Sequence, residues 1–207
     1  MQIICERYAE LYNKYCIPFS IHSSSCNPPL PIHFNPVWII KLANKPEFPY
    51  ISVEPYLYGR YIKYNNNYGY VNESDEKRNT PQAFSHFTFE ASRHTLIIVD
   101  IQGVGDLFTD PQIHSIDTTL FGNGNYGIYG IDRFLRTHRC NPLCQYLKLL
   151  PVNPIEEDQG TLPSTKYMIS DDIDHFLVKQ TDYKNIFDKE SKSDNDKYIV
   201  LMIVNMY

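Results

Sequence analysis

The sequence predicts an α+β fold, because segments with helical periodicity and strand-like segments both occur within its first 150 residues. Residues 1–15 repeat apolar side chains at helical spacing. Thr80 and Pro81 form a typical helix start, in which Thr is the capping residue and Pro loses no bonded N–H. Residues 95–99 are rich in branched apolar side chains and predict a buried strand that ends at Asp100.

The composition is that of a globular protein, with 43% hydrophobic and 21% charged residues. Its 207 residues are about 1.4 typical domain lengths and predict one domain with a tail. The net charge of −5 argues against a nucleic-acid or membrane partner, because phosphate binding depends on clustered cations. No apolar run approaches the ~20 residues of a membrane span, and the first residues do not resemble a secretory signal. Five cysteines, an odd number, favour reduced thiols and a cytoplasmic location.

The first half of the chain is expected to begin with a helix and continue with strands. The apolar face of the 1–15 helix consists of Cys5, Tyr8, Leu11, Tyr12 and Tyr15. Three prolines make residues 23–31 a loop. Strands are expected at 37–42 and 50–54, joined by a turn at 44–49, and residues 61–64 lead into a polar turn at 65–69.

The second half is expected to contain two helices around a glycine-rich stretch. The helix that starts at Thr80 runs to about Glu90, residues 103–130 are punctuated by glycine, and a helix at 131–137 precedes two cysteines. Beyond residue 150 the chain becomes polar and charged, so residues 151–207 are interpreted as an appendage. Its last stretch, 198–204, is apolar enough to dock as a strand.

Two acidic residues and one amide follow the predicted strand at 95–99. Asp100, Gln102 and Asp110 lie within eleven residues, and Pro111 is expected to hold Asp110 in an extended conformation. Carboxylate and amide oxygens suit phosphoryl transfer, in which one acid orients the attacking hydroxyl and others hold Mg²⁺. The spacing alone favours the alternative, in which these are loop acids that cap backbone N–H groups.

A compact His/Cys pattern follows the helix expected at 131–137. His138, Cys140 and Cys144 place three metal-ligand types within seven residues, and a helix starting at Pro142 would put Cys144 one turn from Cys140. A closed zinc site needs a fourth ligand, for which His86 is the first candidate, although spacing alone only weakly favours it over His94 or His114. Buried cysteines in a reduced core are the alternative.

Residues 122–127 read Gly-x-Gly-x-x-Gly, the phosphate-binding pattern of dinucleotide folds. The preceding segment is a weak strand, and no acidic residue stands ~20 positions further on, where such folds carry one. A flexible loop over a substrate is therefore preferred to a nicotinamide-cofactor site.

Four stretches together resemble the alpha-kinase family of atypical protein kinases: TPQAFSHFTFE at 80–90, VDIQGVGDLFTDPQIH at 99–114, FGNGNYG at 121–127 and THRCNPLC at 137–144. The stretches VEPYL at 53–57 and GRYIKYNNN at 59–67 fit the segment that links the two lobes of these kinases. The resemblance extends from residue 1 to about residue 150. Motifs of this length in this order favour the catalytic interpretation of Asp100 and Asp110 over the capping one.

The resemblance implies an α+β alpha-kinase fold, mostly C-lobe, with an incomplete N-lobe. Residues 1–150 would form the kinase domain, in which 1–57 are a remnant of the N-lobe and the hinge and 58–150 are the C-lobe with its zinc site. Residues 151–207 would be a polar C-terminal tail. The implied activity is transfer of the ATP γ-phosphate to a serine or threonine hydroxyl of a protein, with a translation elongation factor as one candidate substrate.

The resemblance also implies roles for individual residues. Asp100 would be the catalytic carboxylate, assisted by Gln102 and Asp110, which would hold Mg²⁺ against the ATP phosphates. Glu54 and Leu57 would present backbone groups to adenine. Structural zinc would be held by His86, His138, Cys140 and Cys144, and residues 122–127 would shape the loop near the protein substrate.

One expected feature of the family is missing from the sequence. Family kinases carry a lysine for the ATP phosphates on a strand before the helix that residues 1–15 match. Lys41 lies only thirteen residues before Glu54, which leaves no room for the helix that follows the lysine strand of ordinary kinases, so Lys41 is interpreted as a surface lysine. The chain is therefore expected to be either a fragment of a kinase or a relative with impaired activity, and a zinc-containing scaffold without catalysis is the alternative function.

Overall fold

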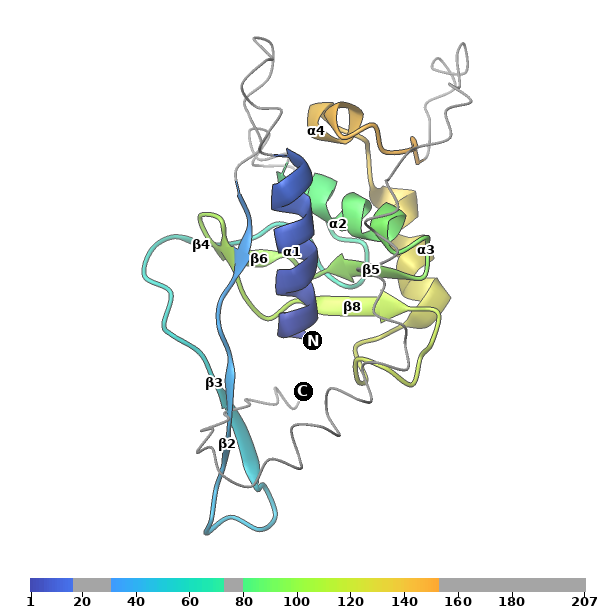
Figure 1. Ribbon diagram of the computed structural model, residues 1–207. Helices are drawn as coiled ribbons and strands as arrows, with labels where there is room; N and C mark the ends of the chain where they lie inside the picture. Colours follow the sequence, from blue (N-terminus) through green and yellow to red (C-terminus); the bar gives the residue numbers. More distant parts are fainter. Residues whose placement is uncertain (17–30, 73–79, 153–207) are drawn as a thin grey trace, which may run out of the picture. The chain divides into compact units, whose positions relative to one another are not determined.

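The computed structural model describes residues 1–16, 31–72 and 80–152, which divide into two compact units (Figure 1). Within the described residues, the larger unit contains Met1–Asn35 and the residues from Tyr56 onward, and the smaller unit contains Pro36–Pro55. The strand expected at 198–204 and nearly all of the loop expected at 23–31 lie outside the described residues. In the described part of the chain, no helix combines the length and apolar character needed to cross a membrane.

The smaller unit is a β-hairpin of β2 (Trp38–Lys41) and β3 (Tyr50–Val53), which confirms the two strands predicted there. The strands are antiparallel, with Trp38 opposite Val53, and the Leu42 N–H donates to the Pro49 carbonyl at 2.7 Å to close the loop. Lys41 is exposed, as expected for a surface lysine.

The N-terminal helix α1 (Gln2–Cys16) buries the face predicted from its periodicity. Cys5, Leu11 and Tyr12 are buried, and Ala9 joins them. The Tyr12 ring meets Phe84 and Phe87 edge-on, with ring centroids 5.6 and 5.4 Å away. These contacts pack α1 against α2 (Thr80–Ala91).

Helix α2 packs on the strand predicted to be buried, β5 (Leu96–Val99), all four residues of which are buried. The contact is fixed by a side chain as well as by apolar packing, because the Ile98 N–H donates to Thr88 Oγ1 at 3.0 Å. β5 pairs antiparallel with β8 (Gln112–Ser115), and α3 (Gly127–Thr137) packs on β8. The last described helix, α4 (Pro142–Tyr146), contacts α2.

The stretch at 103–130 is more regular than its glycines predict. Besides β8, it contains most of β6 (Gln102–Val104) and all of β7 (Leu107–Phe108). These join β1 (His33–Phe34) and β4 (Tyr61–Lys63) in a sheet of order β1-β7-β6-β4. Helix α3 also begins four residues before the predicted start at residue 131.

Gly103 explains how β6 and β7 pair so closely. Its φ is +155°, and a Cβ at this position would lie 2.2 Å from the Leu107 carbonyl oxygen. The glycine therefore allows the close approach of these two strands.

Candidate active site and metal centre

The first group of candidate residues lies at the end of β5. Asp100 directly follows the strand and has a φ of +61°, a region that residues with side chains rarely adopt. A backbone conformation of this kind persists only where its surroundings hold it in place. Asp100 is thus fixed in an unusual orientation at the end of a fully buried strand.

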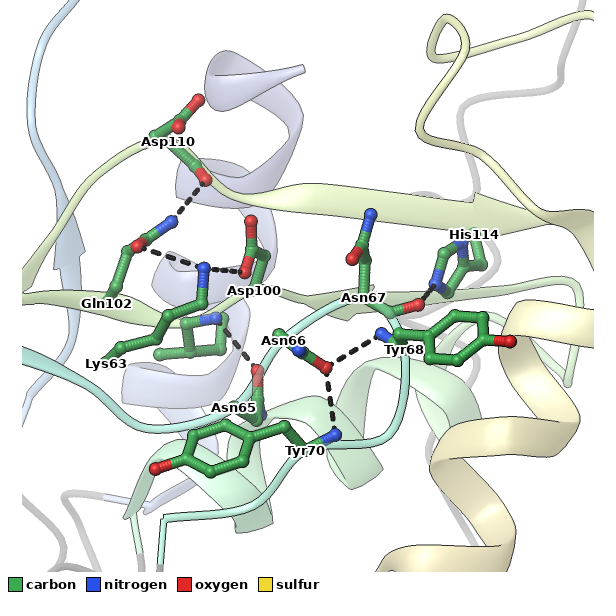
Figure 2. Close-up of polar contacts among 11 residues, drawn as sticks. Lys63, Asn65, Asn66, Asn67, Tyr68, Tyr70, Asp100, Gln102, Asp110 and His114 are labelled. Atoms are coloured by element: carbon green, nitrogen blue, oxygen red, sulfur yellow. Dashed lines mark hydrogen bonds and ion pairs between the residues drawn. The ribbon is translucent and has the colours of Figure 1, made fainter. Parts of the chain in front are cut away.

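Lys63 pairs with Asp100 and joins it to Gln102 (Figure 2). The Lys63 Nζ lies 2.6 Å from Asp100 Oδ1 and donates to Gln102 Oε1 at 3.3 Å. Lys63 and Gln102 are cross-strand partners in the antiparallel pair of β4 and β6. The side chains of Lys63 and Asp100 are 42% and 18% exposed, so solvent reaches the Lys63 side chain, whereas Asp100 Oδ1 itself is buried.

Asp110 is connected to this group through its main chain. The Gln102 Nε2 donates to the Asp110 backbone carbonyl at 3.1 Å, and in Figure 2 the Asp110 carboxylate extends away from Lys63. Asp110 has a φ of +47°, so the extended conformation expected before Pro111 is wrong. The physical reason is that residues 109–111 turn the chain out of the sheet of β7 and into the pair of β5 and β8.

Lys63 is a functional candidate that sequence reasoning missed. It lies within the motif at 59–67, but its separation from Asp100 by 37 residues gives no local signal that the two side chains meet. Its ammonium group contacts both a carboxylate oxygen of Asp100 and the amide oxygen of Gln102. The two oxygens therefore already form a small site suited to positive charge.

Glu54 and Leu57, the residues expected near adenine, lie on either side of the division between the two units. Glu54 follows β3 in the smaller unit, and Leu57 lies in the segment that leads to β4 in the larger one. Both side chains are partly buried.

The second group of candidate residues is a His/Cys cluster of the larger unit. Four ligand atoms, one from each of His86, His138, Cys140 and Cys144, lie within 4.8 Å of one another. Cys140 Sγ is 3.8 Å from His86 Nδ1, and Cys144 Sγ is 3.6 Å from His138 Nε2. The cluster joins α2, the end of α3 and α4.

Local structure places Cys144 in this cluster. The Asn141 side chain accepts hydrogen bonds from the backbone N–H groups of Leu143 and Cys144, at 3.0 and 3.2 Å, and so caps α4. With Pro142 in the first turn, this confirms the helix start that the sequence predicts and presents Cys144 one turn beyond Cys140.

The donor set fits a tetrahedral zinc ion. Two cysteines and two histidines are a common structural zinc set, and two thiolates would balance the charge of the metal. The hydrogen bond from the Cys144 thiol lowers the pKa of Cys140 and favours its thiolate, and the same bond, together with burial, raises the pKa of Cys144. Without a metal the two cysteines therefore share one proton, which a bound metal would displace. Burial lowers the pKa of His138, which favours the neutral ring that a metal requires.

The other two candidate histidines have different partners. His94 is 54% exposed and lies 3.3 Å from Glu90 Oε1. The His114 ring is buried between two loops, where its Nε2 donates to the Asn67 carbonyl at 2.9 Å and its Nδ1 accepts from the Tyr126 N–H at 3.1 Å. The structure thus brings His86, rather than His94 or His114, to the cysteines.

The Gly-x-Gly-x-x-Gly segment is held in place by Asn125. The Asn125 Oδ1 accepts from the N–H groups of Ser115 and Gly127, and its Nδ2 donates to Ser115 Oγ and to the carbonyls of Asp117 and Leu120. This network ties the segment to β8 and to the start of α3. The preceding strand β8 is antiparallel to its partner, whereas dinucleotide folds place this motif after a parallel strand.

Comparisons with known proteins identify chains that are similar to this one. A family model described as the alpha-kinase family matches residues 1–144. The chain is 53% identical over 139 residues to alpha-protein kinase 1 of Dictyostelium discoideum, covering 66% of this chain and 10% of that protein. It is 44% identical over 160 residues to human eukaryotic elongation factor 2 kinase, covering 76% of this chain and 20% of that protein.

A solved structure gives the same result for the fold. The crystal structure of the alpha-kinase domain of myosin heavy chain kinase A in complex with ADP has a TM-score of 0.62 and 43% sequence identity. The match covers 72% of this chain and 56% of that chain. The chain therefore spans about half of a solved domain and between a tenth and a fifth of the curated relatives described above.

Proposed function

Because the chain belongs to the alpha-kinase family, whose members are protein kinases, we propose that it transfers the γ-phosphate of ATP to a serine or threonine hydroxyl of a protein. The observation that carries this proposal is the Lys63–Asp100–Gln102 group at the end of β5. It combines a carboxylate, an amide oxygen and a cation in a partly exposed position, which are the groups that phosphoryl transfer needs.

ATP is the proposed phosphate donor. Solved relatives of 42–43% identity are complexes of myosin heavy chain kinase A with ADP and with AMP-PNP. In this chain, the backbone groups of Glu54 and Leu57 are the proposed contacts to adenine, because both residues lie in the segment that connects β3 to β4.

Asp100 is the proposed catalytic carboxylate. It is the first residue beyond a buried strand, and its strained backbone directs the side chain toward Lys63. An oriented carboxylate can accept a hydrogen bond from the attacking hydroxyl and receive its proton as the new P–O bond forms. The proton then resides on Asp100 until solvent removes it, and ADP carries the negative charge of the leaving group.

Lys63, Gln102 and Asp110 are proposed to act on the ATP phosphates, Lys63 directly and the other two through Mg²⁺. The Lys63 ammonium can contact a phosphate oxygen, because solvent reaches its side chain. Gln102 and Asp110 are the proposed ligands of Mg²⁺, with Gln102 Oε1 already turned toward the cationic centre. Bound Mg²⁺ would supply neutralisation of the negative charge on the phosphates.

The His/Cys cluster is proposed to hold structural zinc. All four ligands come from protein side chains, so a bound ion would join helices rather than activate a substrate. The thiolates need a reducing compartment, which supports a cytoplasmic location.

A transfer assay tests the catalytic proposal. Purified chain is incubated with radiolabelled ATP, Mg²⁺ and a serine/threonine peptide array. Wild type should transfer label, and Asp100→Asn should lower the rate by at least ~100-fold, the usual contribution of a positioned acid or base. Asp132→Asn is the matched control, because that carboxylate is 45% exposed and pairs with Arg136 on the surface of α3.

Two results would reject the proposal. If wild type transfers no label to any peptide, the chain is not an active kinase and the scaffold function is favoured. If Asp100→Asn and Asp132→Asn transfer equally well, another group carries out the reaction.

The protein substrate is proposed from the relatives. Elongation factor 2 kinases of mouse and human are 45% and 44% identical to the chain, and myosin heavy chain kinases B and C are 45% and 46% identical. A translation elongation factor is therefore the first substrate to test, with a myosin heavy chain as the comparison. A rate with the elongation factor no higher than that with the peptide array would exclude it.

A further inference from the structure

Asn65 is a buried polar residue that contacts the backbone next to Asp100. Its side chain is 1% exposed and makes two hydrogen bonds. The Asn65 Oδ1 accepts from the Ile101 N–H at 2.9 Å, and its Nδ2 donates to Ser85 Oγ at 3.1 Å (Figure 2). A buried amide of this kind is costly unless both of its ends are satisfied, as they are here.

The backbone of the same segment holds the other polar group of Ile101. The Tyr64 N–H donates to the Ile101 carbonyl at 2.8 Å, and the Asn65 N–H points to the same oxygen at 3.4 Å. Both the N–H and the carbonyl of Ile101 are therefore bound to residues 64 and 65. On its other side, Asp100 follows Val99, which is paired with Gln112 in the sheet.

Asp100 is thus held between two fixed points. A φ of +61° places its side chain toward Lys63, and that conformation needs external support. Lys63 lies two residues before Asn65 in the same segment. This segment therefore supplies both the cation that pairs with the Asp100 carboxylate and the side chain that binds the backbone N–H of Ile101.

We propose that Asn65 is a positioning residue for Asp100: its side chain fixes the Asp100–Ile101 turn and thereby aims the carboxylate. The inference rests on the proposed function, because it takes Asp100 as the catalytic group. It adds a second link, since Ser85 lies on α2 directly before His86. Through Ser85, α2, which carries His86 of the His/Cys cluster, is connected to the turn that carries Asp100.

The role predicts a specific kinetic result. Asn65→Ala removes the acceptor for the Ile101 N–H, so the carboxylate loses its fixed direction while the ATP contacts proposed for other residues remain. We expect kcat to fall roughly 100-fold, the effect of a misplacement of about 1 Å, and KM for ATP to change by less than about threefold. Asn65→Asp retains an acceptor oxygen, and Ser85 can donate to it, so this variant should recover most of kcat.

Thr88→Val is the matched control. Thr88, on α2, is fully buried like Asn65, and its Oγ1 accepts from the N–H of Ile98 at 3.0 Å. Ile98 lies on β5, two residues before Asp100. The Thr88 hydroxyl also donates to the Ser85 backbone carbonyl at 2.7 Å, so Thr88→Val, like Asn65→Ala, removes two buried hydrogen bonds but leaves Ile101 bound. Thr88→Val should lower thermal stability about as much as Asn65→Ala and leave kcat within about twofold of wild type.

Two measurements do not require activity. Amide hydrogen exchange at Ile101 should be faster in Asn65→Ala and unchanged in Thr88→Val, where Ile98 exchanges faster instead. The ¹³C chemical shift of the Asp100 carboxyl carbon at fixed pH should move in Asn65→Ala alone. If Asn65→Ala does not fold, Ser85→Ala, which removes only the acceptor of the Asn65 amide, should show the same changes at smaller size.

The outcomes separate the two proposals. Equal kcat in Asn65→Ala and Thr88→Val, or an unchanged Asp100 carboxyl shift in Asn65→Ala and Ser85→Ala, would overturn the positioning role. If wild type transfers no phosphate while the exchange and chemical-shift changes appear as expected, the kinase proposal fails and the clamp on the Asp100 backbone stands.

Discussion

Single residues in this protein couple segments that lie far apart in the sequence. His114 is the clearest example, because its ring is fully buried and joins the Asn67 carbonyl to the Tyr126 N–H. Its Nε2 carries the proton and its Nδ1 accepts, so the ring is neutral in this arrangement. Gly130 of α3 rests directly on the ring, since a Cβ there would lie 2.4 Å from His114 Cγ.

Gly130→Ala should therefore destabilise the protein by about 1–3 kcal/mol, the usual cost of overpacking, measured as the free energy of unfolding in urea. Ile128→Ala is the control on the same helix, because the Ile128 side chain is 68% exposed. It should stay within about 0.5 kcal/mol of wild type. Equal losses in the two variants would show that the ring can move aside.

His114 also predicts how stability depends on pH. Burial lowers the pKa of His114, with smaller opposing effects from the Asn67 carbonyl and the Asp100 charge. The unfolded chain binds the proton more readily, so stability is complete above the unfolded pKa of about 6.5 and falls as the pH decreases through and below that value.

His114→Gln tests this dependence. Its amide can donate to the Asn67 carbonyl and accept from the Tyr126 N–H but does not titrate. Thermal melts at pH 7.5 and 5.5 should show a smaller loss of melting temperature in the variant than in wild type. The same loss in both would assign the acid sensitivity to other groups.

At the scale of elements, local signals explain α4 and the cluster that it completes. Asn141, Pro142 and Cys144 are adjacent in the sequence, so cap, helix start and ligand could be predicted together. The short strands β6 and β7 could not be predicted from the sequence, because their pairing depends on Gly103 and on partner strands β1 and β4.

Asn141→Ala should cost about 1 kcal/mol in unfolding free energy, because two N–H groups of α4 lose their acceptor. It should also weaken zinc binding, measured by competition with a chromogenic chelator, since Cys144 is one of those two residues. Gln145→Ala, at an exposed position of the same helix, is the control and should leave affinity unchanged. Unaltered affinity in Asn141→Ala would mean that the cluster positions Cys144 without the cap.

Metal removal acts on the same elements. Chelation should lower the melting temperature and speed hydrogen exchange in α4 and at the end of α3, because a closed zinc site contributes folding energy. Cys144→Ser should show the lower melting temperature without chelator, whereas His94→Ala should respond to chelation like wild type. A melt that is insensitive to chelation would argue against a metal held by all four residues.

At the scale of the whole larger unit, one core joins the N-terminal helix to the strands that carry the site. Cys5, Ala9 and Tyr12 of α1 belong to the same buried cluster as Ile98 and Ile101 on either side of Asp100. Figure 1 shows α1 as a separate helix at the start of the chain, yet its packing supports the turn that follows β5.

Tyr12→Ala should consequently destabilise the protein by about 3–5 kcal/mol, the range for removing a large buried aromatic side chain. Tyr15→Ala, at a partly buried position of the same helix, should cost clearly less. Chemical denaturation of both variants measures the difference. Similar values would show that α1 is not part of the cooperative core.

The sequence by itself determined the family, the long helices, the buried strand before Asp100 and the His/Cys pattern. Each of these depends on residues that are close together in the sequence, through periodicity, capping or ligand spacing. Only the tertiary structure decided that Lys63 pairs with Asp100, that Asp110 reaches Gln102 through its carbonyl, and that His86 rather than His114 faces the cysteines. Such contacts join residues tens of positions apart. They follow from how sheets and helices pack, which no local pattern records.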